Sequence, residues 1–164
     1  MPFYAETMIA YQVLLEVNDH PEKYNIETQS GRTHLYMTTM KLAQKKVKSL
    51  RGAFDQATII GFCLASNWNK KNKAFLNKDE QQSLQEFMIL NKFITNHKND
   101  FSKKSIPSSL EEALIKGFQN GYKLGINYAI GKDNRRLPLT IIPHFLRQNK
   151  FIFTKKALLS HEMG

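Results

Sequence analysis

The side chains that could carry out chemistry do not form a recognised catalytic or metal-binding pattern in this sequence. The five histidines lack the paired spacing that metal ligands need, and they are His20, His34, His97, His144 and His161. One cysteine, Cys63, cannot form a structural zinc site alone, and no Glu lies three residues before a His, as di-iron bundles require. We therefore expect no metal, no cofactor and no catalytic residue.

Two further features come closest to a reactive site. The segment from Gly125 to Asp133 partly matches the pattern of a phosphate-binding loop. However, five residues instead of four separate its two glycines, Gly125 and Gly131, and Asp133 replaces the Ser or Thr that would hold magnesium. Cys63 lies in the most apolar stretch of the chain, where burial raises the pKa of a thiol and makes it inert. A nucleophilic pair of Cys63 with His34 or His144 stays open, because such partners meet only in space.

The net positive charge is the unusual feature of the amino-acid composition. Twenty-four Lys and Arg against fourteen Asp and Glu give a net charge of +10. Residues 32–78 contribute +9 and residues 132–156 contribute +6, whereas residues 1–31 contribute −4. Basic tracts of this kind are typical of surfaces that bind phosphate-rich or acidic partners. Lysine enrichment also follows from an AT-rich coding genome, so the sequence leaves that alternative open.

The second basic tract interleaves its cations with aromatic rings and amides. Surfaces that bind nucleic acids use cations for phosphates, aromatic faces for unpaired bases and amides for base edges. The lysines of residues 41–48 could extend the same surface or contact an acidic protein. The candidate residues for binding nucleic acid or an acidic partner are therefore Lys41, Lys45, Lys48, Arg135, Arg136, Arg147, Lys150, Lys155 and Lys156.

Apolar spacing predicts helices along most of the chain. Residues 4–17 are predicted to form an opening helix that stops near Pro21. Residues 19–32 are predicted to form a loop. From Tyr36 to Trp68, apolar and small residues alternate at spacings of four and three, which indicates a long helix that enters the core in its second half. Gly52 is the expected point of a kink or division, and a buried strand at residues 58–64 is the alternative.

A second long helix is predicted from Ser109 to Gly131, where Ser109 and Glu112 form a capping box. One row of this helix is small throughout and consists of Ala113, Gly117, Gly121, Gly125 and Ala129. Interior glycines disfavour a helix, so we expect another backbone to approach the row closely. That backbone belongs to this chain, to a second copy or to a partner helix; the remaining alternative is that the helix breaks at a glycine.

These patterns predict a single all-α domain that spans residues 1–164 and forms a compact bundle of five or six helices. A helix at residues 77–96 and a loop at 99–107 complete the central part. Near the C-terminus, residues 151–153 form either a short β element or the lead into a last helix. The longest nearly continuous apolar stretch, residues 57–65, is far below the ~20 residues that span a bilayer. No secretory signal is present, so we expect a cytoplasmic protein, although export without a signal stays open.

Our preferred functional hypothesis is a non-catalytic helical protein-interaction domain, such as an adaptor, an inhibitor or an effector-like domain. The small row of residues 113–129 is its candidate partner-binding surface, and the partner is another protein or a second copy of the chain. The alternative hypothesis is a nucleic-acid-binding protein that uses the basic tracts 32–78 and 132–156. An enzyme of a class without a sequence motif is the third hypothesis.

Overall fold

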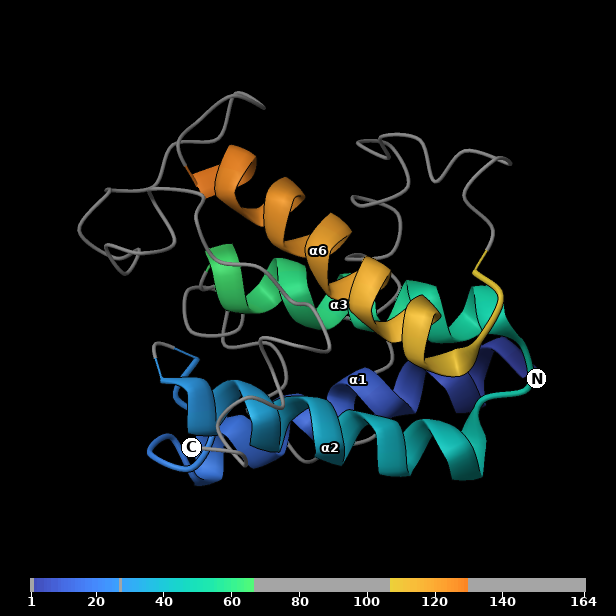
Figure 1. Ribbon diagram of the computed structural model, residues 1–164, viewed down its shortest axis with the longest axis horizontal. Helices are drawn as coiled ribbons and strands as arrows, with labels where there is room; N and C mark the ends of the chain where they lie inside the picture. The colour runs from blue at the N-terminus through green and yellow to red at the C-terminus, as the bar shows by residue number, and fades with distance from the viewer. Residues whose placement is uncertain (1, 27, 67–106, 130–164) are drawn as a thin grey trace.

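The computed structural model describes residues 2–26, 28–66 and 107–129, and within them the chain forms helices and no strands (Figure 1). The helices are α1 (Pro2–Asp19), α2 (Gln29–Lys46), α3 (Leu50–Ser66) and α6 (Leu110–Ala129). The all-α class is confirmed for this part of the chain. Trp68, the predicted helix at 77–96, most of the loop at 99–107 and every element predicted after Gly131 lie outside the described residues.

Helices α1 and α2 form an antiparallel hairpin. Helix α1 ends at Asp19, directly before His20-Pro21, and this confirms the predicted stop. Helix α2 begins at Gln29, because Thr28 has extended backbone angles and its side chain accepts a hydrogen bond from the Gly31 backbone at 2.9 Å. The predicted loop at 19–32 was therefore too long at its end, since its last four residues are helical.

The long helix predicted from Tyr36 is divided, but three to five residues earlier than Gly52. Val47 has extended backbone angles (φ −83°, ψ 135°) and closes α2. The hydroxyl of Ser49 then accepts a hydrogen bond from the Gly52 backbone at 3.0 Å, so Ser49 caps α3 and Gly52 lies in its first turn. The expected division at Gly52 was placed too late because the apolar spacing of four and three continues across this turn. The expected entry into the core is confirmed, and residues 58–64 are helical.

Helix α6 begins at the predicted cap. The Glu112 backbone donates to the Ser109 hydroxyl at 3.1 Å, and the Glu112 carboxylate accepts from the Ser108 backbone at 3.0 Å. The reciprocal bond thus goes to the residue before the cap, and the pair still satisfies two backbone donors at the helix start.

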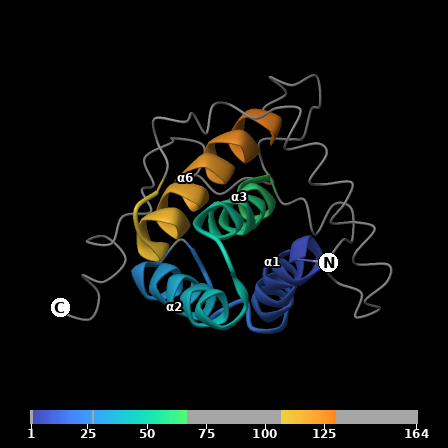
Figure 2. The same ribbon diagram turned by 90° about the vertical axis from the view of Figure 1, so that its right-hand side faces the viewer.

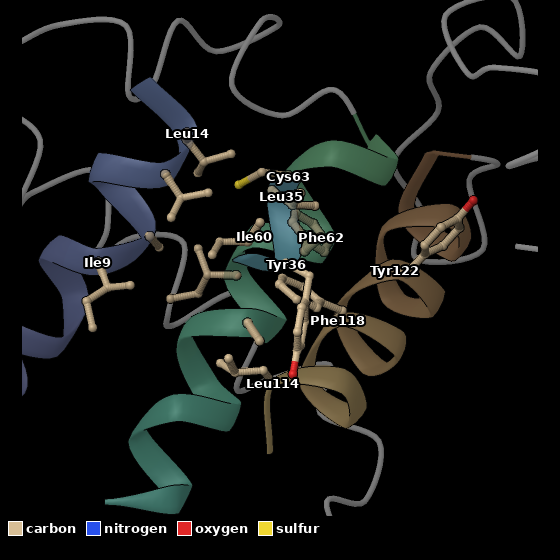
Figure 3. Close-up of a cluster of buried hydrophobic side chains, with 14 of the residues drawn as sticks. Ile9, Leu14, Leu35, Tyr36, Ile60, Phe62, Cys63, Leu114, Phe118 and Tyr122 are labelled. Carbon is tan, nitrogen blue, oxygen red and sulfur yellow. The ribbon is translucent and has the colours of Figure 1, made fainter. Parts of the chain in front are cut away.

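Helix α3 lies between α6 on one side and the α1–α2 hairpin on the other (Figure 2). Its side chains Ile60, Phe62 and Cys63 are at most 1% exposed and meet side chains of all three other helices, as Figure 3 shows. One buried polar group joins the layers, since the Gln56 side-chain oxygen accepts a hydrogen bond from the Ala10 backbone at 3.0 Å. The core of the described residues is therefore built around α3.

Candidate protein-interaction surface

The glycines of the α6 row contact the backbone of α3. A Cβ built on Gly117 would lie 2.5 Å from the Phe54 carbonyl oxygen, and one on Gly125 would lie 2.7 Å from that of Phe62. On Gly121 it would overlap the carbonyl oxygen of Thr58. Any side chain at these three positions would force the two helices apart.

The contact is reciprocal, because α3 also presents a glycine to α6. A Cβ on Gly61 would lie 2.6 Å from the Phe118 carbonyl oxygen and 3.0 Å from the Tyr122 nitrogen. Beside this seam the Asn120 amide donates to the Thr58 hydroxyl at 3.4 Å, which fixes the register of the two helices. Dispersion along a backbone contact this close offsets the cost of the interior glycines.

The structure shows where the small residues of the α6 row lie. Ala113 is fully buried, Gly117, Gly121 and Gly125 pack on α3, and the side chain of Ala129 lies outside the described part of the chain. The sequence left open whether the small row contacts this chain, a second copy or a partner helix. In the structure the row contacts α3 of the same chain, and α6 is continuous from Leu110 to Ala129. The three glycines are covered by α3 and offer no open groove to a partner.

A candidate interaction surface lies on α2. The predicted cations Lys41, Lys45 and Lys48 are all exposed; Lys41 and Lys45 lie four residues apart on one side of α2, and Lys48 follows the extended Val47 just beyond the end of the helix. Met37 lies one turn before Lys41 on the same side and is 50% exposed, the one large hydrophobic side chain among the described residues to be so exposed. The remaining predicted cations, Arg135, Arg136, Arg147, Lys150, Lys155 and Lys156, lie outside the described residues.

A groove runs beside this row, between α1 and α2. It has a volume of about 610 Å³, and its lining residues are Gln12, Leu15, Glu16, Asp19, Tyr24, Thr38, Lys41 and Leu42. The Tyr24 hydroxyl holds the two walls together: it donates to the Glu16 carboxylate at 3.4 Å and lies 3.1 Å from the Thr38 hydroxyl. Sequence reasoning missed this groove. The polar residues Gln12, Glu16 and Asp19 of its first wall follow one another on one side of α1 in the sequence, but the facing wall depends on how α2 pairs with α1.

Charge is distributed unevenly along the α1–α2 hairpin. Near the loop that joins the helices lie the exposed acids Glu16, Asp19 and Glu22, with Lys23 as the basic exception above the Tyr24 ring. At the opposite end of α2 lie the exposed cations Lys45 and Lys48. The hairpin therefore has an acidic loop end and a basic far end. This charge distribution would orient a charged molecule that approaches this face.

Among the described residues, the buried groups of Cys63 and Tyr122 have raised pKa values. Cys63 is fully buried, and burial raises the pKa of its thiol well above the ordinary value. Burial also raises the pKa of Tyr122, against the opposing charge of Arg32. Within the residues the structure describes, no three His, Cys, Asp or Glu side chains gather as a metal site would need.

Comparisons with other proteins give no family to which the chain can be assigned. No protein-family model, no curated protein and no solved structure matches it. In the part of the chain with described structure, every helix falls short of the length or the apolar character that a membrane span requires.

Proposed function

We propose that this protein is a helical protein-interaction domain, a bundle of five or six helices of the adaptor, inhibitor or effector-like type, which binds its partner through the exposed face of α2. The proposal rests on the solvent-exposed Met37 at the head of the row Lys41, Lys45 and Lys48. A large apolar side chain beside ordered cations combines the two components of a protein interface, a desolvated anchor and a charged rim.

The chemistry of this face defines the partner. Lys41 and Lys45 lie about 6 Å apart along α2, and Lys48 follows just beyond the end of the helix, so these lysines match a partner that presents several carboxylates close together. Met37 is flexible and polarisable and can fit an irregular apolar pocket between those carboxylates. We therefore propose an acidic protein surface with one apolar depression as the partner.

A capture experiment with charge-reversed variants tests the proposal. The chain is immobilised, exposed to a nuclease-treated native lysate, and its bound proteins are identified by mass spectrometry. The variant Lys41→Glu/Lys45→Glu should lose the captured partner, and Met37→Ser should weaken it about tenfold, as loss of a central anchor does. The control Lys116→Glu/Lys123→Glu makes the same change in net charge on α6 and should retain it. Capture that survives in all three variants would contradict the proposal, as would the absence of any captured protein at low salt.

Nucleic acid is the second candidate, favoured by the exposure of Lys41, Lys45 and Lys48 together with the +9 charge of residues 32–78. A binding isotherm at two salt concentrations separates it from the first. Contacts with phosphates release counterions, so the affinity for nucleic acid would fall by about 10³-fold or more from 50 to 200 mM salt if some six phosphates were contacted. Capture that disappears after nuclease treatment, with an isotherm of that steepness, would favour nucleic acid over a protein partner.

A further inference from the structure

The groove between α1 and α2 carries opposite charges at its two ends. On the α1 wall Glu16 and Asp19 lie toward the loop, and on the α2 wall Lys41 lies toward the far end. We propose that this groove binds an extended peptide segment whose four residues, counted from the loop end, are a cation, any residue, an apolar residue and an acid. This inference rests on the proposed function, because the segment belongs to the protein partner and Lys41 is common to the groove and the exposed face of α2.

The hydrogen bonds of Tyr24 fix the relative levels of the two walls. Its hydroxyl contacts the Glu16 carboxylate at 3.4 Å and the Thr38 hydroxyl at 3.1 Å, so these two side chains lie at about the same level of the hairpin. Asp19 lies three residues closer to the loop than Glu16. Lys41 lies three residues farther from the loop than Thr38, because the two helices are antiparallel (Figure 1). At 1.5 Å per residue, the acidic and basic ends of the groove are thus about 9 Å apart, on opposite walls.

An extended chain matches this spacing. It advances about 3.3 Å per residue, and its successive side chains point to opposite sides. A segment that lies lengthwise in the groove therefore places residues three apart on opposite walls, at a separation of about 10 Å. With its first residue at Asp19, the second lies near the level of Thr38 on the α2 wall. The third then lies near Leu15 on the α1 wall, and the fourth lies near Lys41.

The chemistry of the walls assigns a residue type to each charged or apolar position. Asp19 favours a cation at the first position, since the neighbouring Glu16 carboxylate already accepts the Tyr24 hydroxyl. The half-buried Leu15 favours an apolar side chain at the third position, and Lys41 favours a carboxylate at the fourth. That carboxylate would continue the acidic surface that we propose for the partner of α2.

The dimensions of the groove favour an extended segment over a helix. Its volume of about 610 Å³ is typical of a site that takes a small ligand. A helix with its side chains is about 10–12 Å wide. Because the single hydroxyl of Tyr24 contacts side chains of both walls, the groove at that level is too narrow to admit a helix. An extended segment can instead lie along the groove and direct its side chains to either wall.

An NMR titration of the full chain with synthetic tetrapeptides tests the inference. The dipolar probes are Arg-Ser-Leu-Glu and the reversed sequence Glu-Leu-Ser-Arg, because an extended segment can lie in either direction. The dibasic control is Arg-Ser-Leu-Arg and the diacidic control is Glu-Ser-Leu-Glu, and all four peptides are blocked at both ends. Binding is followed through the methyl signals of Leu15 and Leu42, which line the groove and so distinguish it from other charged surfaces.

At least one dipolar peptide should shift both leucine signals and bind about three- to tenfold more tightly than either control, as expected for two exposed charge pairs. Lys41→Glu should reverse this preference in favour of the dibasic peptide. Lys123→Glu makes the same change in net charge on α6 and should behave as the wild-type chain, and circular dichroism checks that both variants retain their helices.

Three results would overturn the inference. The first is a pair of leucine signals that stay unchanged with every peptide up to about 5 mM, where even millimolar binding is detected. The second is a control peptide that binds the wild-type groove as tightly as the better dipolar peptide. The third is a folded Lys41→Glu chain that keeps the wild-type preference.

The outcomes separate this inference from the proposed function. A partner captured through Met37 and Lys45, by a chain whose groove binds none of the dipolar peptides, overturns the inference and leaves the proposed function intact. A groove that binds the dipolar peptide with the expected reversal in Lys41→Glu, on a chain that captures no protein, supports the specificity of the groove and removes the acidic partner of α2.

Discussion

The α-carbon of Gly121 lies against the carbonyl oxygen of Thr58, so close that a Cβ at position 121 would overlap it. The same Cβ would lie 2.8 Å from the Phe62 nitrogen, and neither backbone atom can turn away as a side chain would. Gly121→Ala should therefore lower the free energy of unfolding by about 1–3 kcal/mol, although alanine favours a helix by about 1 kcal/mol over glycine. Urea denaturation followed by circular dichroism measures the change.

Lys123→Ala is the matched control for that substitution, because Lys123 is exposed two residues further along α6. Its effect should stay within about 0.5 kcal/mol. If Gly121→Ala proved as stable as the control, the close approach of α6 to α3 would not exist in solution.

The start of α6 offers a second prediction. Ser109→Ala removes the acceptor of the Glu112 backbone and should lower stability by about 1 kcal/mol. Glu112→Ala removes the acceptor of the Ser108 backbone. Because the two bonds share one helix end, the double variant should lose less than the two single losses added together. Thermal unfolding of the four proteins gives the comparison, and strictly additive losses would show that the two bonds act independently.

Cys63 should be unreactive in the folded protein. Burial raises the pKa of its thiol and also excludes the reagent, so thiolate chemistry requires an opening of the core. We expect labelling with a thiol reagent at about pH 8 to be at least 10³-fold slower than in denaturant, since it follows the small population of opened molecules. Rapid labelling of the native chain would indicate that α3 is not enclosed as described, and would reopen Cys63 as a nucleophile.

Alkaline pH should destabilise the protein through Tyr36. Burial, together with the charge of Glu111 and a hydrogen bond to it, raises the pKa of Tyr36 to about 12. A tyrosine in the unfolded chain titrates near pH 10, so above about pH 9 the unfolded state loses a proton that the folded state keeps, and stability falls as the pH rises toward 12.

The substitution Tyr36→Phe isolates this contribution. It removes the hydroxyl and should make the decline between about pH 9 and 11 less steep, even if stability at neutral pH is lower. Urea midpoints across that range give the slope for each protein. Equal slopes would mean that Tyr36 does not contribute to the alkaline loss.

The parts of the fold that were predicted from sequence are those set by neighbouring residues. The stop of α1 before Pro21, the cap at Ser109 and the glycine row of α6 are all local signals, and each is present in the structure. The close approach that the glycines indicated was also correct. What the row could not reveal was the identity of its neighbour, since Gly61 contributes only once α3 is placed against α6.

The errors arose where two signals competed. Ser49 and Thr28 are both N-cap residues, but the apolar spacing runs on past Ser49, and the first turn of α2 is short of large apolar residues. The groove between α1 and α2 could not be predicted without the tertiary pairing of the two helices, because the residues of α1 and α2 that line it are nineteen or more residues apart in the chain. The acidic and basic ends of the hairpin were apparent in the sequence only as the net charges of residues 1–31 and 32–78.

The central place of α3 has a consequence for synthesis on the ribosome. Its glycine-bearing side is covered by a helix that ends at Ala129, 63 residues after Ser66. At typical elongation rates of 5–20 residues per second, roughly 3–13 s pass between the emergence of the two segments. During that interval the nascent chain displays an apolar helix side without its cover, which makes it a natural client for chaperones and makes fragments that stop before Leu110 prone to aggregate.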